Sequence, residues 1–336
     1  MPRHHTDAGM AEWYTRSTQN RLPKGLRVRV PLPAQMKKAK VIVILGPTSS
    51  GKTALSIALA QKFNGEVVSA DSRQVYRGLT LGTGKVTKKE MAGIPHHLLD
   101  VANPKKVFSV AEYKEHAERA IEGILSRGKV PIVCGGTGFY IDTLINGTEL
   151  PDVPPNKPLR AKLETKDAPA LFQIFKKLDP IRATTIDSNN PVRLIRAIEI
   201  ATALGNVPKL KKANPPYETL KLGLDMDDET LKKRIVVRLA ERVKKGMLRE
   251  AKTLHEAGLS WRRMRALGLE YRHMADLLSG KSERKEFKQK LAADIWQYAR
   301  RQRQWFKRDT AIIWLNPTQK TATKDAVTFA KKFLAM

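Results

Sequence analysis

The clearest chemical signal in the sequence is a glycine-rich loop that follows a short apolar run and precedes a segment with helical spacing. The loop fits the pattern G-x-x-x-x-G-K-[ST] in the context that this motif requires. Glycines let backbone N–H groups turn toward an anion, and the start of the next helix adds partial positive charge. The pattern predicts a binding site for a phosphate chain. The loop consists of Gly46, Pro47, Thr48, Ser49, Ser50, Gly51, Lys52 and Thr53.

Two side chains at the end of this loop carry specific expectations. Lys52 can reach a terminal phosphate, and the Thr53 hydroxyl can bind Mg²⁺. We therefore expect Mg²⁺ as a cofactor, with Thr53 as its protein ligand. The motif does not reveal which compound carries the phosphates.

Two further polar residues each follow a β-rich run. Asp71 comes after residues 66–70, and Thr137 comes after residues 130–134, within the turn Gly135-Gly136-Thr137-Gly138. Ligands of an open parallel sheet bind at the carboxyl ends of its strands, so both should face one crevice. Asp71 can hold Mg²⁺ or accept a proton there, but it suits a helix N-cap equally well. The glycine turn can equally be a plain strand-to-helix connection.

The segments that must position these residues alternate between strands and helices, which predicts an α/β fold with a parallel sheet. Ser109, with Glu112 three residues later, has the pattern of a capping box. Strands are expected at 41–45, 66–70, 130–134, 219–225 and 311–315, and helices at 54–63, 109–127, 228–257 and 284–308, with a closing helix after the last strand.

The chain is predicted to divide into a core and an insertion. A proline-rich stretch at 151–155 precedes a basic, strand-free segment, 158–212, which we interpret as a helical insertion. Residues 40–157 and 213–336 then form a P-loop NTPase-like core with long C-terminal helices. Residues 1–39 are expected to be a disordered basic leader, unless the true start is Met36.

The charge balance favours a polyanionic partner. The 336 residues include 62 Lys and Arg against 33 Asp and Glu, a net charge of +29. Neutralising phosphates releases counterions, so this surplus favours a nucleic acid. An anionic membrane surface is less favoured, because no apolar anchor lies beside the basic clusters. No apolar run is long enough for a membrane span.

Cysteine usage limits the redox and metal chemistry of the chain. Cys134 is the single cysteine, so neither an internal disulfide nor a CxxC metal pair can form. It lies in an apolar run and is expected to be a buried structural thiol. A reducing cytoplasm fits this composition, and we expect a cytoplasmic monomer.

Taken together, the motifs resemble the tRNA dimethylallyltransferases, also called bacterial-type tRNA isopentenyltransferases. The likeness runs in order from about residue 40 to the end and is much more specific than the loop alone. The matching segments are GPTSSGKT (46–53), SADSRQVY (69–76), PHHLLD (95–100), GGTGFY (135–140), NNPVRLIRAIE (189–199), ALGLEYR (266–272) and YARRQRQWFKR (298–308).

The resemblance implies transfer of a dimethylallyl group from dimethylallyl diphosphate to N6 of the adenine 3′ to the anticodon. The expected substrates are tRNAs that read codons beginning with U, and the products are N6-isopentenyladenosine and diphosphate. It implies that Asp71 is the general base, that Thr137 positions the adenine, and that Lys52 assists the leaving group. It also points to Arg234 or Arg238 as a diphosphate contact, without choosing between them. Whether the donor is hydroxylated stays open.

Carried over position by position, the resemblance also implies contacts to the tRNA anticodon stem-loop. The family often has Gly-Tyr where this chain has Gly268-Leu269-Glu270-Tyr271, so the aromatic residue is displaced. The implied contacts are Asp71, Ser72, Arg73, Gln74, Thr137, Arg160, Val192, Arg193, Leu194, Ile195, Arg196, Arg265, Gly268 and Arg272.

The arginine-rich segment 298–308 has two interpretations. Tyr298, Gln302 and Trp305 share one helical face, which can simply pack on the core. Arg300, Arg301 and Arg303 can be a solvated flank, although we predict that some of them contact RNA. His96 and His97, in PHHLLD, are expected to be structural.

Two other functions share parts of this pattern. A small-molecule kinase would have the same loop, Mg²⁺ and sheet, but a small acceptor needs no long basic helical half. A non-catalytic RNA-binding protein with a nucleotide switch would not need Asp71 and Thr137 together at the strand ends.

Overall fold

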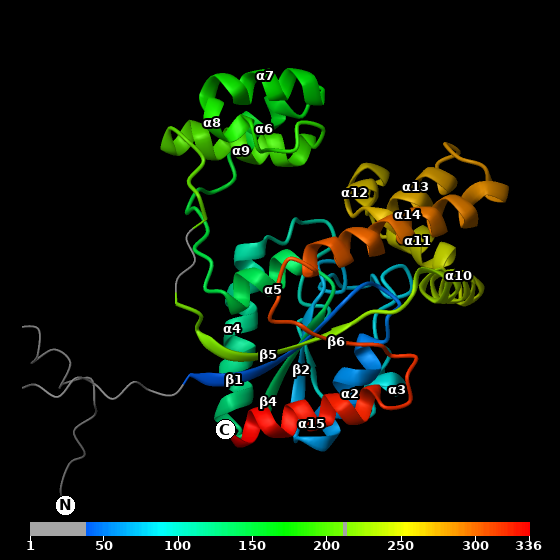
Figure 1. The fold of residues 1–336 in the computed structure, drawn as a ribbon. Helices are drawn as coiled ribbons and strands as arrows, with labels where there is room; N and C mark the ends of the chain where they lie inside the picture. The colour runs from blue at the N-terminus through cyan, green and yellow to red at the C-terminus, as the bar shows by residue number, and fades with distance from the viewer. Residues whose placement is uncertain (1–37, 211–213) are drawn as a thin grey trace, which may run out of the picture. The chain divides into compact units, whose positions relative to one another are not determined.

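The computed structural model describes residues 38–210 and 214–336, so the expectation for the leader falls almost wholly outside the described residues. Within them, six strands form one parallel sheet in the order β3-β2-β4-β1-β5-β6 (Figure 1). The predicted α/β fold with a parallel sheet is confirmed. The strands are β1 (Ala39–Leu45), β2 (Gly65–Ala70), β3 (His96–His97), β4 (Val130–Gly135), β5 (Tyr217–Leu224) and β6 (Ile313–Leu315).

The central strand β1 is buried on both faces because helices cover the sheet on each side. Alternate residues of a strand point to opposite faces. Val43 thus packs in the cluster that contains Ile121 of α4 (Val110–Ser126), while Ile44 packs in the cluster that contains Leu59 of α2 (Lys52–Lys62). The helices next to the sheet are α2 (Lys52–Lys62), α4 (Val110–Ser126), α5 (Gly138–Ile145) and α15 (Ala322–Ala335), with the short α3 (Lys88–Met91) after β2.

The predicted capping box at the start of α4 is confirmed. Ser109 accepts a hydrogen bond from the backbone N–H of Glu112, and the Glu112 carboxylate accepts one from the backbone N–H of Ser109. Both bonds satisfy N–H groups that a helix start leaves without partners. The local sequence therefore fixes where this helix begins.

Between α5 and β5 the described residues form helices and connecting loops without a strand, as expected for the insertion. A hydrophobic cluster that includes Leu171, Phe175 and Leu194 holds its helices together. The Glu199 carboxylate is fully buried at its base, where it accepts hydrogen bonds from the Arg160 guanidinium at 2.7 Å. The helices are α6 (Lys157–Leu163), α7 (Ala168–Leu178), α8 (Pro180–Ala183) and α9 (Pro191–Leu204).

The C-terminal half contains the predicted long helices with one correction. The expected single helix over 228–257 is wrong, because it is interrupted at Gly246, whose φ of 102° is left-handed backbone that favours glycine. A second hydrophobic cluster, which includes Leu239, Met274 and Leu291, joins these helices. They are α10 (Asp228–Lys244), α11 (Met247–Glu256), α12 (Trp261–Ala266), α13 (Leu269–Leu278) and α14 (Arg284–Phe306).

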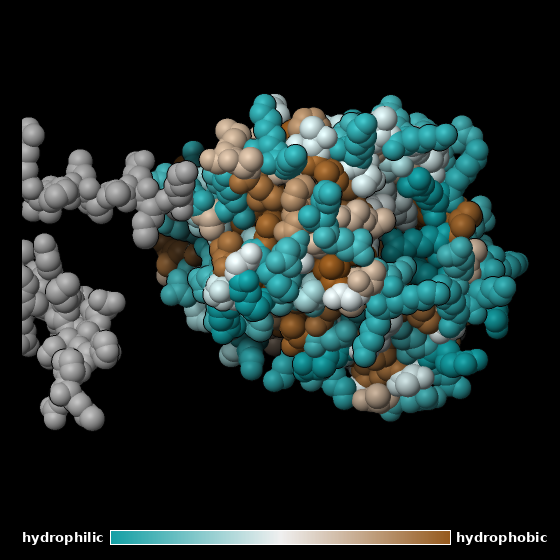
Figure 2. Space-filling model, turned by 90° about the horizontal axis from the view of Figure 1, so that it is seen from below, coloured by the Kyte–Doolittle hydropathy of each residue, from teal (hydrophilic) through white to brown (hydrophobic). Residues whose placement is uncertain are grey.

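The surface matches the high content of charged residues. On the face shown in Figure 2, hydrophilic residues predominate and smaller hydrophobic areas lie between them. No helix among the described residues has both the length and the apolar character that a membrane crossing requires.

One buried ion cluster anchors the edge of the sheet near β3. The Glu66 carboxylate, 3% exposed, lies 2.7 Å from His97 Nε2 and from Arg127 Nη2, and 2.8 Å from Lys129 Nζ. Burial alone would raise the pKa of Glu66, but the hydrogen bonds from Arg127, Lys129 and His97 outweigh it and lower the pKa to about 2. His97 thus has the structural role that the sequence suggested.

We predict that Glu66→Gln lowers the free energy of unfolding at pH 7 by about 1–3 kcal/mol, because charge-assisted hydrogen bonds are lost. A depressed carboxyl pKa contributes stability above the ordinary value of 4.5, and this contribution disappears as the pH falls toward about 2. Urea denaturation of both proteins between pH 7 and pH 2 should show the difference shrinking below about pH 4.5. The exposed pair partner Glu115 gives the control, since Glu115→Gln should change stability by less than about 0.5 kcal/mol. A difference that stays constant with pH would contradict the assignment.

Candidate active site

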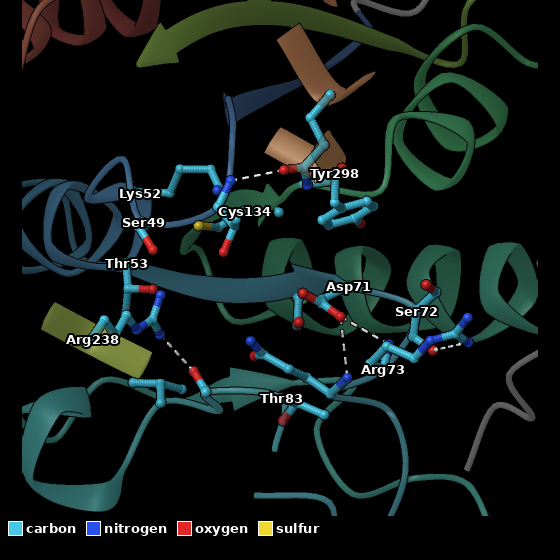
Figure 3. Close-up of a pocket in the computed structure, with 18 of the residues that line it drawn as sticks. Ser49, Lys52, Thr53, Asp71, Ser72, Arg73, Thr83, Cys134, Arg238 and Tyr298 are labelled. Atoms are coloured by element: carbon cyan, nitrogen blue, oxygen red, sulfur yellow. Dashed lines mark hydrogen bonds between the residues drawn. The ribbon is translucent and has the colours of Figure 1, made fainter. Parts of the chain in front are cut away.

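A cavity of about 610 Å³ lies where the phosphate-loop motif and the Asp71 turn meet, after the carboxyl ends of β1, β2 and β4. Figure 3 shows Ser49, Lys52, Thr53 and Arg238 gathered on one side, and Asp71, Ser72 and Arg73 on the other, with Cys134 between them. Asp71 thus faces the cavity as predicted, whereas Thr137 is not among the residues that line it, although Gly135 and Gly136 just before it are. The sequence-predicted residues that line the cavity are Thr48, Ser49, Gly51, Lys52, Thr53, Asp71, Ser72, Arg73, Gln74, Arg238 and Gly268.

The phosphate loop is shaped by backbone packing that excludes side chains. Gly46 has a φ of 138°, and a Cβ atom on it would lie 2.3 Å from the carbonyl oxygen of Leu224 on β5. Gly51, with a φ of 100°, forms the N-cap of α2. Gly46, Pro47 and Ser50 are buried beneath the loop and do not line the cavity. Cavity-facing backbone and the start of α2 thus form the concave surface that an anion requires.

Lys52 lies at the centre of this surface. Its Nζ donates a hydrogen bond to the carbonyl oxygen of Pro47 at 2.7 Å. Burial lowers the pKa of Lys52 to about 8, and the nearby Asp71 carboxylate acts in the opposite direction. A phosphate group beside Lys52 would favour its charged form further.

The Asp71 carboxylate is held by the turn that follows it. Asp71 Oδ1 accepts hydrogen bonds from the backbone N–H groups of Arg73 at 2.8 Å and Gln74 at 3.2 Å. Residues 72–75 form a turn rather than a helix, so the alternative of a helix N-cap is wrong. One oxygen is thereby fixed, and the carboxylate as a whole faces the cavity.

Thr137 is joined to the same turn. Its Oγ1 accepts a hydrogen bond from the backbone N–H of Ser72 at 3.0 Å and lies 3.4 Å from Ser72 Oγ. The Thr137 N–H donates to the carbonyl oxygen of Ala70 at 3.1 Å. The Tyr298 hydroxyl also bonds to Thr137, and burial raises the pKa of that phenol well above its ordinary value. The candidate base and the candidate positioning hydroxyl therefore form one connected structure.

The turn before Thr137 requires its glycines. A Cβ atom on Gly135 would lie 2.1 Å from the carbonyl oxygen of Ala70, and one on Gly136 would lie 2.2 Å from Gln302 Nε2. These distances are far below any van der Waals contact. The turn is thus more than a plain connection, because it permits close approach on two sides.

The two arginines on α10 that compete for the diphosphate occupy different positions. Arg238 lines the cavity, and its Nη2 donates to the carbonyl oxygen of Gly84 at 2.8 Å. Arg234 Nη1 lies 4.0 Å from the point where a Cβ of Gly51 would be, just outside the lining. Both arginines are close to the phosphate loop, but only Arg238 is part of the cavity lining.

Comparisons with known proteins agree with this geometry. The family model described as IPP transferase matches residues 74–309. tRNA dimethylallyltransferase 2 of Treponema denticola is 43% identical over 81% of this chain and 92% of its own length. The tRNA dimethylallyltransferase of Staphylococcus aureus is 41% identical over 83% of this chain and 93% of its own length.

Solved structures give the same result. The full-length tRNA isopentenylpyrophosphate transferase from Bacillus halodurans aligns with a TM-score of 0.68 and 34% identity, covering 89% of this chain and 97% of that one. A eukaryotic dimethylallyltransferase acting on tRNA aligns with a TM-score of 0.73 and 28% identity, covering 88% and 80%. The chain belongs to the tRNA dimethylallyltransferase family.

Several of the family's expected tRNA contacts have internal partners in this chain. Arg160 and Arg196 both bond to the buried Glu199 carboxylate, with side chains about one-third exposed. Leu194 and Ile195 are buried in the insertion core, so their side chains are not presented to an RNA. At the start of the same helix, α9, two neighbouring side chains are exposed, Val192 and Arg193.

On the C-terminal helices the pattern is similar. Arg265 pairs with Asp276, and Arg272 pairs with Asp294 at 2.8 Å. Arg160, Arg196, Arg265 and Arg272 are therefore held by carboxylates, and phosphates would have to displace or share those partners. Gly268, by contrast, lines the cavity itself.

The arginines of helix α14 differ in their surroundings. Arg303 is not a solvated flank, because it bonds to Asp225, Asp228 and the carbonyl oxygen of Met226. Arg300 and Arg301 are exposed, as an RNA contact requires.

Cys134 was expected to be a buried structural thiol. It is half-buried, packs against the cluster that contains Ile44, and also lines the cavity. Burial raises the pKa of its thiol. The displaced aromatic residue Tyr271 is buried and donates its hydroxyl proton to Glu250 Oε1 at 2.6 Å, so its role is structural.

Sequence reasoning missed one wall of the site, the segment 80–84. Its backbone N–H groups at Thr80, Leu81 and Gly82 donate to the Glu250 carboxylate from distances of 2.7 to 3.0 Å. Thr83 and Gly84 then line the cavity. The glycines of the segment signal a turn, but nothing local reveals a carboxylate partner about 170 positions away.

We predict that Gly135→Ala destabilises the protein by about 1–3 kcal/mol and lowers tRNA-modifying activity, since the new methyl group pushes β2 and β4 apart next to Asp71. Gly123→Ala on α4 is the matched control. It meets only the flexible end of Arg127 at 3.4 Å and should leave stability equal or slightly higher. Thermal unfolding and a single-turnover assay on both variants check this. Equal behaviour of the two would show that the close approach at Gly135 is unimportant.

Proposed function

We propose that this enzyme transfers a dimethylallyl group from dimethylallyl diphosphate to N6 of the adenine 3′ to the anticodon. Its substrates are tRNAs that read codons beginning with U, and its products are N6-isopentenyladenosine and diphosphate. The observation that carries the proposal is one cavity with an anion-binding loop on one side and, on the other, Asp71 in a turn that is hydrogen-bonded to Thr137 through Ser72. Such a cavity brings a diphosphate ester and an amine nucleophile together.

The phosphate side of the cavity supports departure of diphosphate. Loop N–H groups, the helix N-terminus and Lys52 stabilise the negative charge that grows as the C–O bond breaks. Arg238 adds a second cation in the same cavity. The donor's leaving group is thereby held where the protein supplies the most positive potential.

We include Mg²⁺ in this proposal as the cofactor. The Thr53 hydroxyl and the Asp71 carboxylate both line the cavity, and these are hard oxygen donors of the kind that Mg²⁺ prefers. Mg²⁺ usually takes few protein ligands and fills its shell with phosphate oxygens and water, which fits Thr53 as the protein ligand. When bound, the ion would neutralise diphosphate charge.

The other side of the cavity supports attack by the adenine amine. N6 forms a bond to the prenyl C1 while the C1–O bond to diphosphate breaks, and N6 then loses one proton. Asp71 accepts that proton as general base. Thr137, which accepts a hydrogen bond from Ser72 in the turn after Asp71, positions the adenine. The adenine has to leave its stack to enter, at a cost of a few kcal/mol.

The basic surface of the enzyme offsets this cost through phosphate contacts. Exposed cations such as Arg193, Arg300 and Arg301 are free to approach the anticodon stem-loop, while Arg160, Arg196, Arg265 and Arg272 start from ion pairs with carboxylates. The proposed substrate places the reaction in the cytoplasm. Light scattering can test the expected monomeric state.

The test is a direct assay. The protein, Mg²⁺, dimethylallyl diphosphate and undermodified tRNA are incubated, and the digested nucleosides are weighed by mass spectrometry. Prenylated adenosine is expected, and omission of Mg²⁺ should abolish it. A parallel mixture with ATP should show no RNA-independent release of γ-phosphate. Robust ATP turnover without prenyl transfer would favour a kinase and overturn the proposal.

We predict that Asp71→Asn lowers the single-turnover rate by about 10²–10⁴-fold, because the amide keeps the shape of the carboxylate but cannot accept the proton. Binding of tRNA should change little. Asp325→Asn, on α15 and outside the cavity, serves as the control and should keep the full rate. A variant of Asp71 with an unchanged rate would remove it as the base.

We predict that Arg238→Gln raises KM for dimethylallyl diphosphate more than Arg234→Gln does, because only the first lies in the cavity lining. Loss of one charge-assisted hydrogen bond to a phosphate costs about 1.5–3 kcal/mol, or roughly 10- to 100-fold in affinity. Steady-state titration of the donor with both variants decides between the two arginines. A larger effect at Arg234 would reverse the assignment.

A further inference from the structure

Gln302 on α14 is a buried polar side chain that touches both halves of the site. It is 6% exposed and lines the cavity. Its Oε1 accepts a hydrogen bond from the backbone N–H of Thr48 in the phosphate loop at 2.8 Å. Its Nε2 donates to the carbonyl oxygen of Gly136, also at 2.8 Å. One amide thus bridges the donor loop and the turn that leads to Thr137.

The surrounding backbone is shaped to admit this amide. A Cβ atom on Gly136 would lie 2.2 Å from Gln302 Nε2 and 3.5 Å from the carbonyl oxygen of Gly46. The two turns therefore approach each other at the amide, with no side chain of Gly136 between them. Beyond the paired ends of β1 and β4, the length of Gln302 matches the gap between the two turns.

The chemistry of the amide matches its partners. One turn presents an N–H donor and the other a carbonyl acceptor, so the bridging group must accept on one side and donate on the other. A carboxylate can only accept, and it would place an oxygen against the oxygen of Gly136. The pairing also fixes the orientation of the Gln302 amide.

We propose that Gln302 is a positioning residue that holds the phosphate loop and the Thr137 turn at the spacing that prenyl transfer requires. This inference rests on the proposed function. Reaction needs the attacked carbon and the attacking nitrogen about 3–3.5 Å apart, and a misplacement of about 1 Å can cost on the order of 10²-fold. The phosphate loop holds the donor, Asp71 and Thr137 hold the acceptor, and Gln302 fixes one to the other.

The same helix carries a second side chain that bonds to the Thr137 turn, and exposed cations between the two. Tyr298, one turn before Gln302, bonds to Thr137 from the cavity side. Arg300 and Arg301, between them in sequence, are exposed. RNA phosphates bound to these arginines would therefore contact the element that sets the geometry of the reaction.

The experiment compares the full-length enzyme with Gln302→Glu and Gln302→Met in single-turnover prenyl transfer between pH 5 and pH 8. Met has nearly the same length but makes neither hydrogen bond, and we expect it to lower the rate constant of transfer by about 10²-fold at all pH values. The donor concentration for half-maximal rate should change much less, because neither substrate loses a direct contact.

Gln302→Glu gives a signature that a merely structural role would not produce. The neutral carboxylic acid can accept from Thr48 and donate to Gly136, so its rate relative to wild type should rise as the pH is lowered, while the ratio for Met stays flat. Thermal unfolding of each variant over the same pH range reports any change in stability separately.

The outcomes separate the two hypotheses. Absence of prenyl transfer by the wild-type enzyme would count against the proposed function. An active wild type with both variants within about threefold of its rate, or with the same flat pH ratio for Glu and Met, would overturn the role of Gln302. If Gln302→Glu does not fold, a Met variant that folds and keeps the wild-type rate would overturn it equally.

Discussion

The site depends on backbone approaching backbone at the carboxyl edge of the parallel sheet. Leu45 of β1 lies in register with Gly135 on one side and Gly223 on the other, so the turns that follow neighbouring strands start level. At that edge a Cβ on Gly46 or on Gly135 would meet a neighbouring carbonyl oxygen within 2.3 Å. Only glycine permits such contact. The convergence of the phosphate loop and the turn that contains Thr137 is thus a consequence of sheet geometry, and the candidate catalytic side chains are added to it.

Electrostatics acts at two ranges in this enzyme. The net charge of +29 attracts a polyanion over distances up to a Debye length, without specifying where it docks. Close to the surface, carboxylates hold many arginines in fixed positions, as Glu199 does for Arg160 and Arg196. An arginine already fixed in this way loses less conformational entropy when it meets a phosphate, but it gains less Coulomb energy. The exposed Arg193, Arg300 and Arg301 keep the full Coulomb gain.

Features set by local sequence were predictable, and features set by distant contacts were not. The phosphate loop, the capping box at Ser109 and the positions of five of the six described strands each depend on a few adjacent residues, and each was predicted. The order of the strands in the sheet and the short strand β3 were not predicted. The break at Gly246 was missed because apolar spacing continues through it, although its left-handed φ ends the helix. The Glu250 carboxylate under segment 80–84 and the placement of Cys134 in the cavity depend on tertiary packing, which no local pattern encodes.

One face of α14 lines the cavity and another carries exposed arginines. The cavity face bears on the choice between alkyl transfer and phosphoryl transfer. A kinase has to bring its acceptor hydroxyl directly to the terminal phosphate. An apolar part of the cavity between the phosphate loop and Asp71 would keep those two reactants apart. Here Cys134 lies between the phosphate loop and Asp71 (Figure 3). Ile57, Ile295 and Tyr298 also line the cavity. A prenyl group needs such an apolar part, because apolar walls take up its hydrocarbon and keep water from the carbon under attack. The buried face of α14 supplies part of the apolar cavity wall through Ile295 and Tyr298. This explains why a helix rich in arginine also lines the cavity.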